Sequence, residues 1–162
     1  MQIDWKNIDK SENKIIEGWL SDEDRKMLCM EEKNWETTAN DIRDCLKFMK
    51  HAQFRNAIGY VAGQPACAVM FGVEYSGRVL RIYNLVVNPG LRNLGIGKQM
   101  VRDVFSKENK FELERTYSKI TTSTLPQNRK SQKIFESNGF HFDGYNDDYV
   151  DFSKDVSKEL GK

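Results

Sequence analysis

The clearest chemical pattern in this 162-residue sequence is a glycine-containing turn between an apolar run and an amphipathic segment. The apolar run 79–87 ends at a Pro-Gly turn, which is followed by Arg92, Asn93, Leu94, Gly95, Ile96, Gly97 and Lys98. The N-terminus of a helix binds anions because its N–H groups are unpaired and its dipole is positive there. Glycine lets an anion approach the backbone closely, and Arg92 and Lys98 add positive charge. The pattern therefore predicts a phosphate-binding turn.

Other phosphate-binding loops have different glycine spacings. The P-loop pattern G-x-x-x-x-G-K-[ST] and the dinucleotide pattern G-x-G-x-x-G are both absent from this turn. An ordinary turn with two glycines and a surface arginine is the alternative. The order of strand, turn, arginine and helix favours the anion site.

A second motif follows after one more predicted strand. It begins at Asn128 and reads N-R-K-S-Q-K-I-F-E-S-N-G-F. The two motifs resemble R/Q-x-x-G-x-G/A and N-x-x-[AS]-x-x-[FLI]-Y-x-x-x-G-F of the GNAT acetyltransferase superfamily. The resemblance implies acetyl-CoA as acyl donor, a primary amine as acceptor and no metal.

The resemblance also assigns roles to residues. It implies that the turn 92–98 binds the pyrophosphate of coenzyme A and that Leu85, Val86 and Val87 bind pantetheine through backbone groups. Asn128, Ser131 and Phe135 are expected to complete the cofactor site. The acetyl group is expected to move by direct attack of the amine in a ternary complex, helped by the Val87 N–H.

Phe135 departs from the family pattern, in which many members have a tyrosine that protonates the leaving thiolate. Either another group or water supplies this proton, or the protein binds acyl-CoA without efficient transfer. A thiol has a pKa of about 8.5, so its thiolate leaves fairly well, and a general acid contributes only about 10²–10⁴-fold. The substitutes considered are Ser131, one helical turn before Phe135, and Tyr83, Tyr145 and Tyr149.

The reaction also needs a base, because a protonated amine has no lone pair. In relatives an acid often lies on the central strand, where this sequence has Tyr83 and Asn84. Glu74 on the preceding strand is the best alternative base, unless it is a solvated turn residue. Asp147 and Asp148 are weaker candidates.

The elements that must position these residues follow from hydrophobic periodicity. Helices are predicted over 11–20, capped by Ser11, then after a Ser21 cap, and over 40–49. Strands are predicted over 54–61, 65–75 and 79–87 as an antiparallel meander. A helix over 95–107, a strand over 119–124, a helix over 128–137 and closing strands over 140–142 and 149–152 follow.

This order predicts one α/β (α+β) domain over residues 1–162. The family resemblance adds a GNAT-like mixed, mostly antiparallel central sheet with a splayed central strand pair and helices on both faces. Exposed strand edges often form dimers in that family, so a homodimer is a further expectation by analogy.

Composition limits the partners and the compartment. The chain has 25 Lys and Arg against 24 Asp and Glu, so no bulk charge favours nucleic acid or membrane. Three cysteines and two histidines show no zinc-ligand spacing. No secretory signal or membrane span is visible, which makes the cytoplasm the expected compartment.

Three functional hypotheses remain at this stage. The first is an active N-acetyltransferase for a small-molecule or peptide amine. The second is a non-catalytic acyl-CoA-binding regulator, suggested by Phe135 and Asn84. The third is a toxin that acetylates aminoacyl-tRNA, and the balanced charge argues against it because RNA binding needs a basic surface.

Overall fold

A seven-stranded mixed sheet organises the chain in the computed structural model, which describes residues 1–49, 52–74 and 77–161. The strand order is β1-β2-β3-β4-β5-β7-β6. Only β4 and β5 pair in parallel among the described residues, and the other neighbours are antiparallel. The strands are β1 (Asp4–Asn7), β2 (Gln53–Val61), β3 (Gln64–Glu74), β4 (Val79–Val87), β5 (Lys119–Thr124), β6 (His141–Asn146) and β7 (Tyr149–Asp155). The mostly antiparallel sheet predicted from the family resemblance is confirmed.

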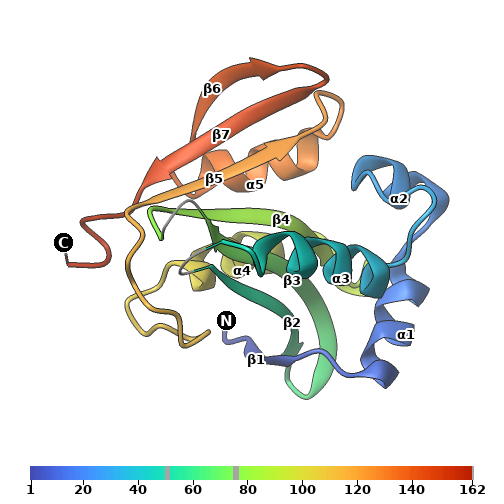
Figure 1. Ribbon diagram of the computed structural model, residues 1–162. Helices are drawn as coiled ribbons and strands as arrows, with labels where there is room; N and C mark the ends of the chain where they lie inside the picture. The colour runs from blue at the N-terminus through green and yellow to red at the C-terminus, as the bar shows by residue number, and fades with distance from the viewer. Residues whose placement is uncertain (50–51, 75–76, 162) are drawn as a thin grey trace.

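Helices cover both faces of this sheet (Figure 1). The first face carries α1 (Lys10–Trp19), α2 (Asp22–Met27) and α3 (Trp35–Leu46), and the opposite face carries α4 (Ile96–Val104) and α5 (Arg129–Ser137). A short 3-10 helix, η1 (Pro89–Leu91), joins β4 to α4.

Each face has its own apolar core. Ile16 and Trp35 pack with Met70 on the α1–α3 face, and Met100 packs with Phe71 on the α4–α5 face. All five side chains are fully buried. Because β3 contributes to both cores through alternate residues, it is the strand that fixes the two helical layers to the sheet.

The parallel pair of strands separates partway along its length. Pairing joins 79–82 of β4 to 119–122 of β5, and both strands continue beyond it without pairing to each other. At the same level the β3–β4 register shifts, so that Met70 faces Asn84 while Phe71 faces Ile82. Tyr83 is the extra residue of this β-bulge, which bends β4 and increases its twist. Figure 1 shows the two strands diverging toward the C-terminal end of β4.

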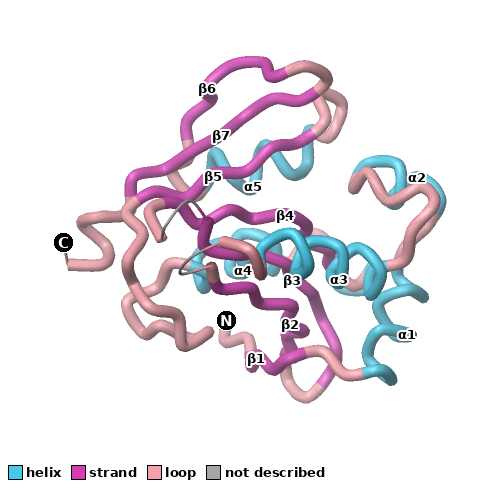
Figure 2. Tube along the Cα trace, in the orientation of Figure 1, coloured by secondary structure: helices cyan, strands magenta, loops and turns pink. Residues whose placement is uncertain are grey.

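The connection from α4 to β5 forms a loop near the N-terminus of the chain (Figure 2). The indole N–H of Trp5 donates to Asp103, 2.9 Å away, and its ring lies 5.0 Å from that of Phe111. Lys110 forms an ion pair with the same buried Asp103 at 3.0 Å. These contacts attach β1 and the connection to α4.

Several element boundaries differ from the sequence prediction. Strand β1 was not predicted, because its sequence is polar and three of its four residues are exposed. Helix α3 begins at Trp35, after an Asn34 cap, rather than at residue 40. Tyr75, the predicted end of the second strand, lies outside the described residues.

The N-cap of α1 is Asp9 rather than the predicted Ser11. The Asp9 carboxylate accepts from the Glu12 N–H at 2.9 Å, and the Glu12 side chain accepts from the Asp9 N–H at 3.1 Å, which completes a capping box. Ser11 instead donates its hydroxyl to Asp9 at 2.7 Å. The hydrogen bond from Ser11, followed by that from Glu12, lowers the pKa of Asp9 from 3.8 to about 2.

This cap makes the free energy of unfolding depend on pH. Because the pKa of Asp9 is lower in the folded state, its contribution is fully present above about pH 3.8 and is lost as the pH falls toward 2. We expect Asp9→Asn to lower the urea midpoint more at pH 5.5 than at pH 3, because asparagine caps the helix without titrating. An equal deficit at both pH values would contradict the assignment.

Candidate active site

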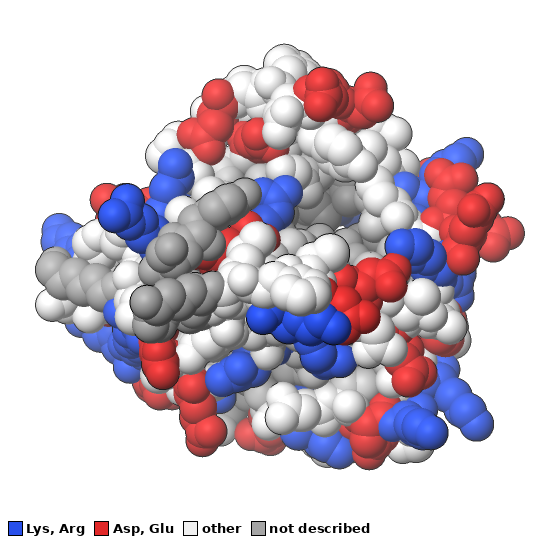
Figure 3. Space-filling view, in the orientation of Figure 1, with Lys and Arg blue, Asp and Glu red and all other residues white. Residues whose placement is uncertain are grey.

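A cavity of about 420 Å³ lies where β4 and β5 separate. Its described lining comes from β4, the end of β5, one face of α5, the end of α2 and the β6–β7 turn. Figure 3 shows the surface hollowed between the β6–β7 hairpin and the rest of the sheet. Of the residues predicted for the site, the cavity brings together Leu85, Asn128, Ser131, Phe135 and Tyr149.

The glycine-containing turn lies outside that lining and directly precedes α4. Gly95 is the N-cap residue with φ of 82°, and no described side chain caps this helix end. A Cβ built on Gly95 would meet no described atom within 4 Å, so the space beside it is open. The left-handed backbone explains why glycine occupies this position. The uncapped N–H groups fit the predicted anion site.

Gly97 has a different structural role. A Cβ at this position would lie 2.7 Å from Cδ1 of Ile134 on α5 and 3.9 Å from Val87. The second glycine of the motif therefore allows α4 to pack closely against α5, in addition to the close ligand approach that the sequence suggested. Asn138 also ties the two helices by donating to the carbonyl of Lys98 at 3.2 Å.

Arg92 connects three parts of the site. Its Nε donates to the Val87 carbonyl at 3.4 Å, and its terminal nitrogen pairs with Asp24 of α2 at 3.3 Å. Burial acts to raise the pKa of Asp24, but the hydrogen bonds from Ser21 and Arg92 outweigh it and the pKa is lowered. The other predicted turn residues Asn93, Leu94 and Lys98 are exposed, whereas Ile96 is buried in the core.

Alternate backbone groups of β4 face the gap. The Asn88 N–H donates to Ala66 at 2.8 Å, toward β3. Since successive residues of an antiparallel strand point their backbone groups to opposite sides, those of Val87 and Leu85 point away from β3. They face the space that β5 has left. Val86 instead pairs with β3 and buries its side chain in the α1–α3 core.

Helix α5 presents the second motif to the cavity. The Asn128 side chain caps the helix by accepting from the Ser131 N–H at 3.3 Å. Ser131 and Phe135 both line the cavity. Phe135 is only 2% exposed, and its ring packs 5.3 Å from Phe140 and 6.4 Å from Phe152.

Glu74 does not line the cavity but is one hydrogen bond away from it. Tyr83 lines the cavity, and its hydroxyl donates to the Glu74 carboxylate. Glu74 is buried rather than solvated. The Tyr83 ring lies above Gly72, where a Cβ would be 3.5 Å from its Cε2. The predicted base and one of the predicted proton donors therefore form a single pair.

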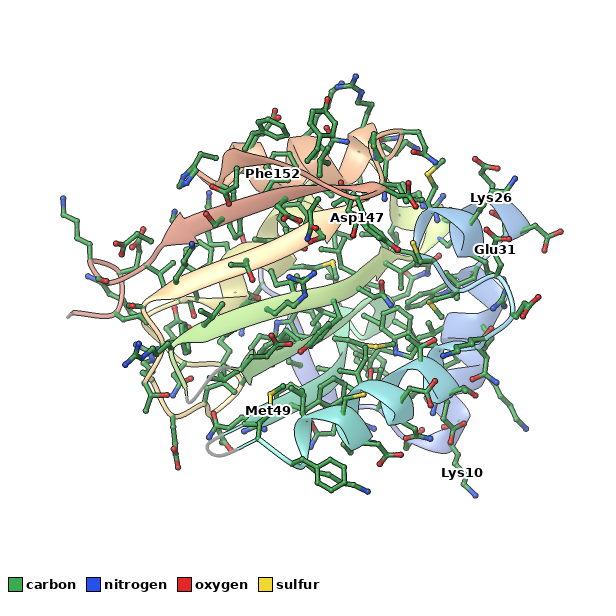
Figure 4. All side chains as sticks on the ribbon, turned by 45° about the horizontal axis from the view of Figure 1, so that its top comes forward. Lys10, Lys26, Glu31, Met49, Asp147 and Phe152 are labelled. Carbon is green, nitrogen blue, oxygen red and sulfur yellow. The ribbon has the colours of Figure 1, made fainter. Side chains whose placement is uncertain are left out.

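The remaining candidates lie at the mouth or outside. Tyr149 lines the cavity and donates to Cys29 at 3.5 Å, and this hydrogen bond is the first cause of its raised pKa. Asp147 lines the same opening, facing α2 in Figure 4, whereas Asp148 does not line it. Tyr145 is 77% exposed and packs against Phe142, away from the cavity.

Two parts of the lining were not predicted as site residues. The end of α2 and the loop after it contribute Met27, Leu28 and Cys29, and no sequence signal placed them beside β4. Arg81 also lines the cavity and donates to Ser123 at 2.9 Å. A charged residue inside the apolar run of β4 was the signal that could have indicated Arg81.

The described residues contain no group of three or more side chains suited to hold a metal ion. Among the described helices, none combines the length and apolar character that crossing a bilayer requires.

The mixed sheet opens beside a helix that begins at a glycine. This is the fold class that the two sequence motifs imply, that of the N-acetyltransferases. The chain belongs to the GNAT acetyltransferase family: residues 54–142, more than half of its length, match the sequence profile of the acetyltransferase (GNAT) domain. A search of curated proteins found no match.

Solved structures agree with this fold. The aminoglycoside acetyltransferase AAC(6')-Ib in complex with coenzyme A is 14% identical with a TM-score of 0.72, over 99% of this chain and 100% of that one. The N-acetyltransferase PseH of Campylobacter jejuni in complex with acetyl-coenzyme A is 16% identical with a TM-score of 0.63, over 95% and 99%. The GNAT domain of S. lividans PAT is 13% identical with a TM-score of 0.68, over 93% and 89%. At these identities the likeness concerns the fold.

The packing role of Gly97 leads to a test by paired substitutions. We expect Gly97→Ala to destabilise the protein by about 1–2 kcal/mol, because the new methyl group would collide with Cδ1 of Ile134. Ile134→Val removes that carbon, so the double variant should recover most of the Gly97→Ala loss when compared with Ile134→Val alone. Urea unfolding of the four proteins measures the coupling, and simple additivity would contradict the packing role.

Proposed function

We propose that this protein transfers the acetyl group of acetyl-CoA to a primary amine by direct attack in a ternary complex. The observation that carries the proposal is the cavity at the β4–β5 opening. Its lining includes cofactor-side residues on α5, Ser131 and Phe135, and, on the other face of the sheet, Tyr83 and Tyr149. A donor and an acceptor can therefore meet in one space.

The cofactor half of the proposal rests on the turn and on β4. The uncapped N-terminus of α4 at Gly95 suits the pyrophosphate of coenzyme A. The backbone groups of Leu85 and Val87 suit the amides of the pantetheine arm, and the Val87 N–H can polarise the thioester carbonyl. Acetyl-CoA supplies the activated acyl group, and the protein supplies position and charge.

The amine is deprotonated through the Tyr83–Glu74 pair in this proposal. An ammonium with a pKa near about 10 must lose a proton before it can attack. The Tyr83 oxygen accepts this proton while its own hydroxyl proton passes to the Glu74 carboxylate. The N–C bond then forms, the C–S bond breaks, and the second amine proton ends on the thiol.

Ser131 is the proposed donor of a proton to the leaving sulfur, and the second amine proton replaces the one that the serine gives up. It lies one turn before Phe135 on α5, both side chains line the cavity, and its hydroxyl has no hydrogen bond within the described part of the chain. Tyr149 fits this role less well, because its hydroxyl already donates to Cys29. Water is the alternative donor.

The acceptor remains a primary amine on a small molecule or peptide. Lysine, arginine and acidic side chains are interspersed on the face shown in Figure 3, which offers no broad basic surface for an RNA backbone. The proposed enzyme is cytoplasmic and needs no metal.

Phe135 supports a second candidate function, that of a regulator that binds acyl-CoA without efficient transfer. Its packed ring carries no hydroxyl that could protonate the leaving thiolate.

The first experiment measures thiol release from acetyl-CoA with amino acids, polyamines, aminoglycosides and lysine peptides, together with calorimetry of acetyl-CoA binding. We expect binding and amine-dependent release. The control pair is Gly95→Asp and Gly95→Asn, which are alike in size and in tolerance of the left-handed backbone but differ in charge. Asp should weaken acetyl-CoA binding by roughly tenfold more than Asn, through repulsion of the pyrophosphate.

Binding without release for any amine would support the regulator. Equal binding by the two folded Gly95 variants would contradict the pyrophosphate assignment.

The proton path has its own test. We expect Glu74→Gln to lower kcat by about 10²-fold or more, because glutamine cannot accept the proton. Tyr83→Phe should lower kcat similarly, and the double variant should be little worse than either one if the two act as a unit. Acetyl-CoA affinity should be unchanged. Independent effects that multiply would contradict the relay.

A further inference from the structure

Arg81 is a charged residue that lines the cavity. It lies on β4 two residues before Tyr83, so the two side chains project from the same face of the strand. Tyr83 leans across Gly72 toward β3, where it bonds Glu74. Arg81 extends the other way, toward β5, where it bonds Ser123. The two groups therefore occupy opposite sides of the cavity floor.

The guanidinium of Arg81 has spare hydrogen-bonding capacity. It is half-buried, and its one hydrogen bond within the described part of the chain runs from a terminal nitrogen to the Ser123 hydroxyl at 2.9 Å. No described carboxylate lies within 4.0 Å of it. An arginine carries five donors arranged as a planar fork, so most of them remain available to a ligand.

Other arginines near the sheet are used differently. Arg92 pairs with Asp24 and Arg25 pairs with Glu17. Arg55 donates to three backbone carbonyls. Removing a guanidinium partly from water without such partners is unfavourable unless a ligand supplies them. Arg81 therefore differs from these arginines in being oriented into a cavity with its fork largely unused.

The surrounding acids do not neutralise this position directly. Ser123 accepts from Arg81 and donates to Asp151 at 2.5 Å, so Asp151 acts on the guanidinium only through the serine. Glu74 is engaged with Tyr83. Asp147 is the one acidic residue in the described lining and lies at the β6–β7 turn, toward α2 (Figure 4). The lining thus offers one cation on the floor and one anion at the rim.

We infer that the acceptor is an amine that also carries a carboxylate, as an amino acid or a short peptide does, and that Arg81 binds this carboxylate through its free donors. The inference rests on the proposed acetyl transfer and specifies its substrate class. The amine of such a molecule faces Tyr83 while its carboxylate faces the guanidinium. A polycation such as a polyamine would place a positive group beside Arg81, which is unfavourable.

The test compares amines that differ only in the carboxylate. Lysine and cadaverine, ornithine and putrescine, and phenylalanine and phenethylamine form such pairs, and thiol release gives kcat/KM for each member. We expect at least one pair to show a roughly tenfold to hundredfold preference for the carboxylate-bearing member, mainly through KM. O-Phosphoethanolamine is tested in the same assay to determine whether a phosphate can replace the carboxylate.

Arg81→Gln should reduce that preference to near unity, and Arg81→Lys should keep part of it, since lysine retains the charge without the fork. Arg78→Gln, which removes an exposed arginine just before β4, is the matched control and should keep the full preference. Thermal unfolding and acetyl-CoA binding confirm that each variant is folded. If Arg81→Gln does not fold, Arg81→Lys alone carries the test.

Two different failures can be told apart. Turnover that is equal for both members of every pair, or a preference that survives Arg81→Gln, would overturn the role of Arg81 while leaving acetyl transfer intact. Acetyl-CoA binding without release from any amine would overturn the proposed transfer itself. Preference for O-phosphoethanolamine over all carboxylates would overturn the assignment of the ligand group.

Discussion

The opening of the sheet between β4 and β5 is the constraint on which the other parts of the site depend. A strand edge that is paired with a neighbouring strand has no free backbone N–H or C=O groups for a ligand. An edge that is not paired exposes such groups, and they need hydrogen-bond partners. Here the bulge at Tyr83 coincides with the last β4–β5 pair, so β4 stays bonded to β3 while it leaves β5. The two apolar cores on β3 hold this geometry from both sides.

The same opening explains why the two halves of the site are linked. Arg92 contacts the Val87 carbonyl at the end of β4 and also Asp24 of α2, and the residues that follow α2 contribute Cys29 to the cavity. The turn proposed to bind the cofactor is therefore also tied to a segment that lines the cavity.

Much of this arrangement was predictable from the sequence, for physical reasons. The turn, α4 and α5 follow from local signals: glycine spacing, periodicity and caps, and the family resemblance gave the mostly antiparallel sheet. What could not be predicted depends on contacts between distant segments. The pairing of Glu74 with Tyr83, the Cys29–Tyr149 contact and the use of Gly97 against Ile134 join residues that no periodicity relates.

Local errors had equally specific causes. Strand β1 has a polar sequence, so its own residues carry little strand signal. Its position is fixed by pairing with β2 and by the Trp5–Asp103 hydrogen bond. At α1, both Asp9 and Ser11 are good capping types, and only the geometry decides between them.

The absence of the family's tyrosine at position 135 costs the proposed reaction little, because the two proton transfers are not equally demanding. At pH 7 an amine with a pKa near about 10 is about one-thousandth neutral, which corresponds to roughly 4 kcal/mol of barrier. A thiol with a pKa near about 8.5 leaves as thiolate at a much smaller cost. In the proposed reaction, the buried carboxylate behind Tyr83 would help with the harder step. Phe135 packs in the aromatic cluster with Phe140 and Phe152, and the proposed proton for sulfur would come from Ser131 or water.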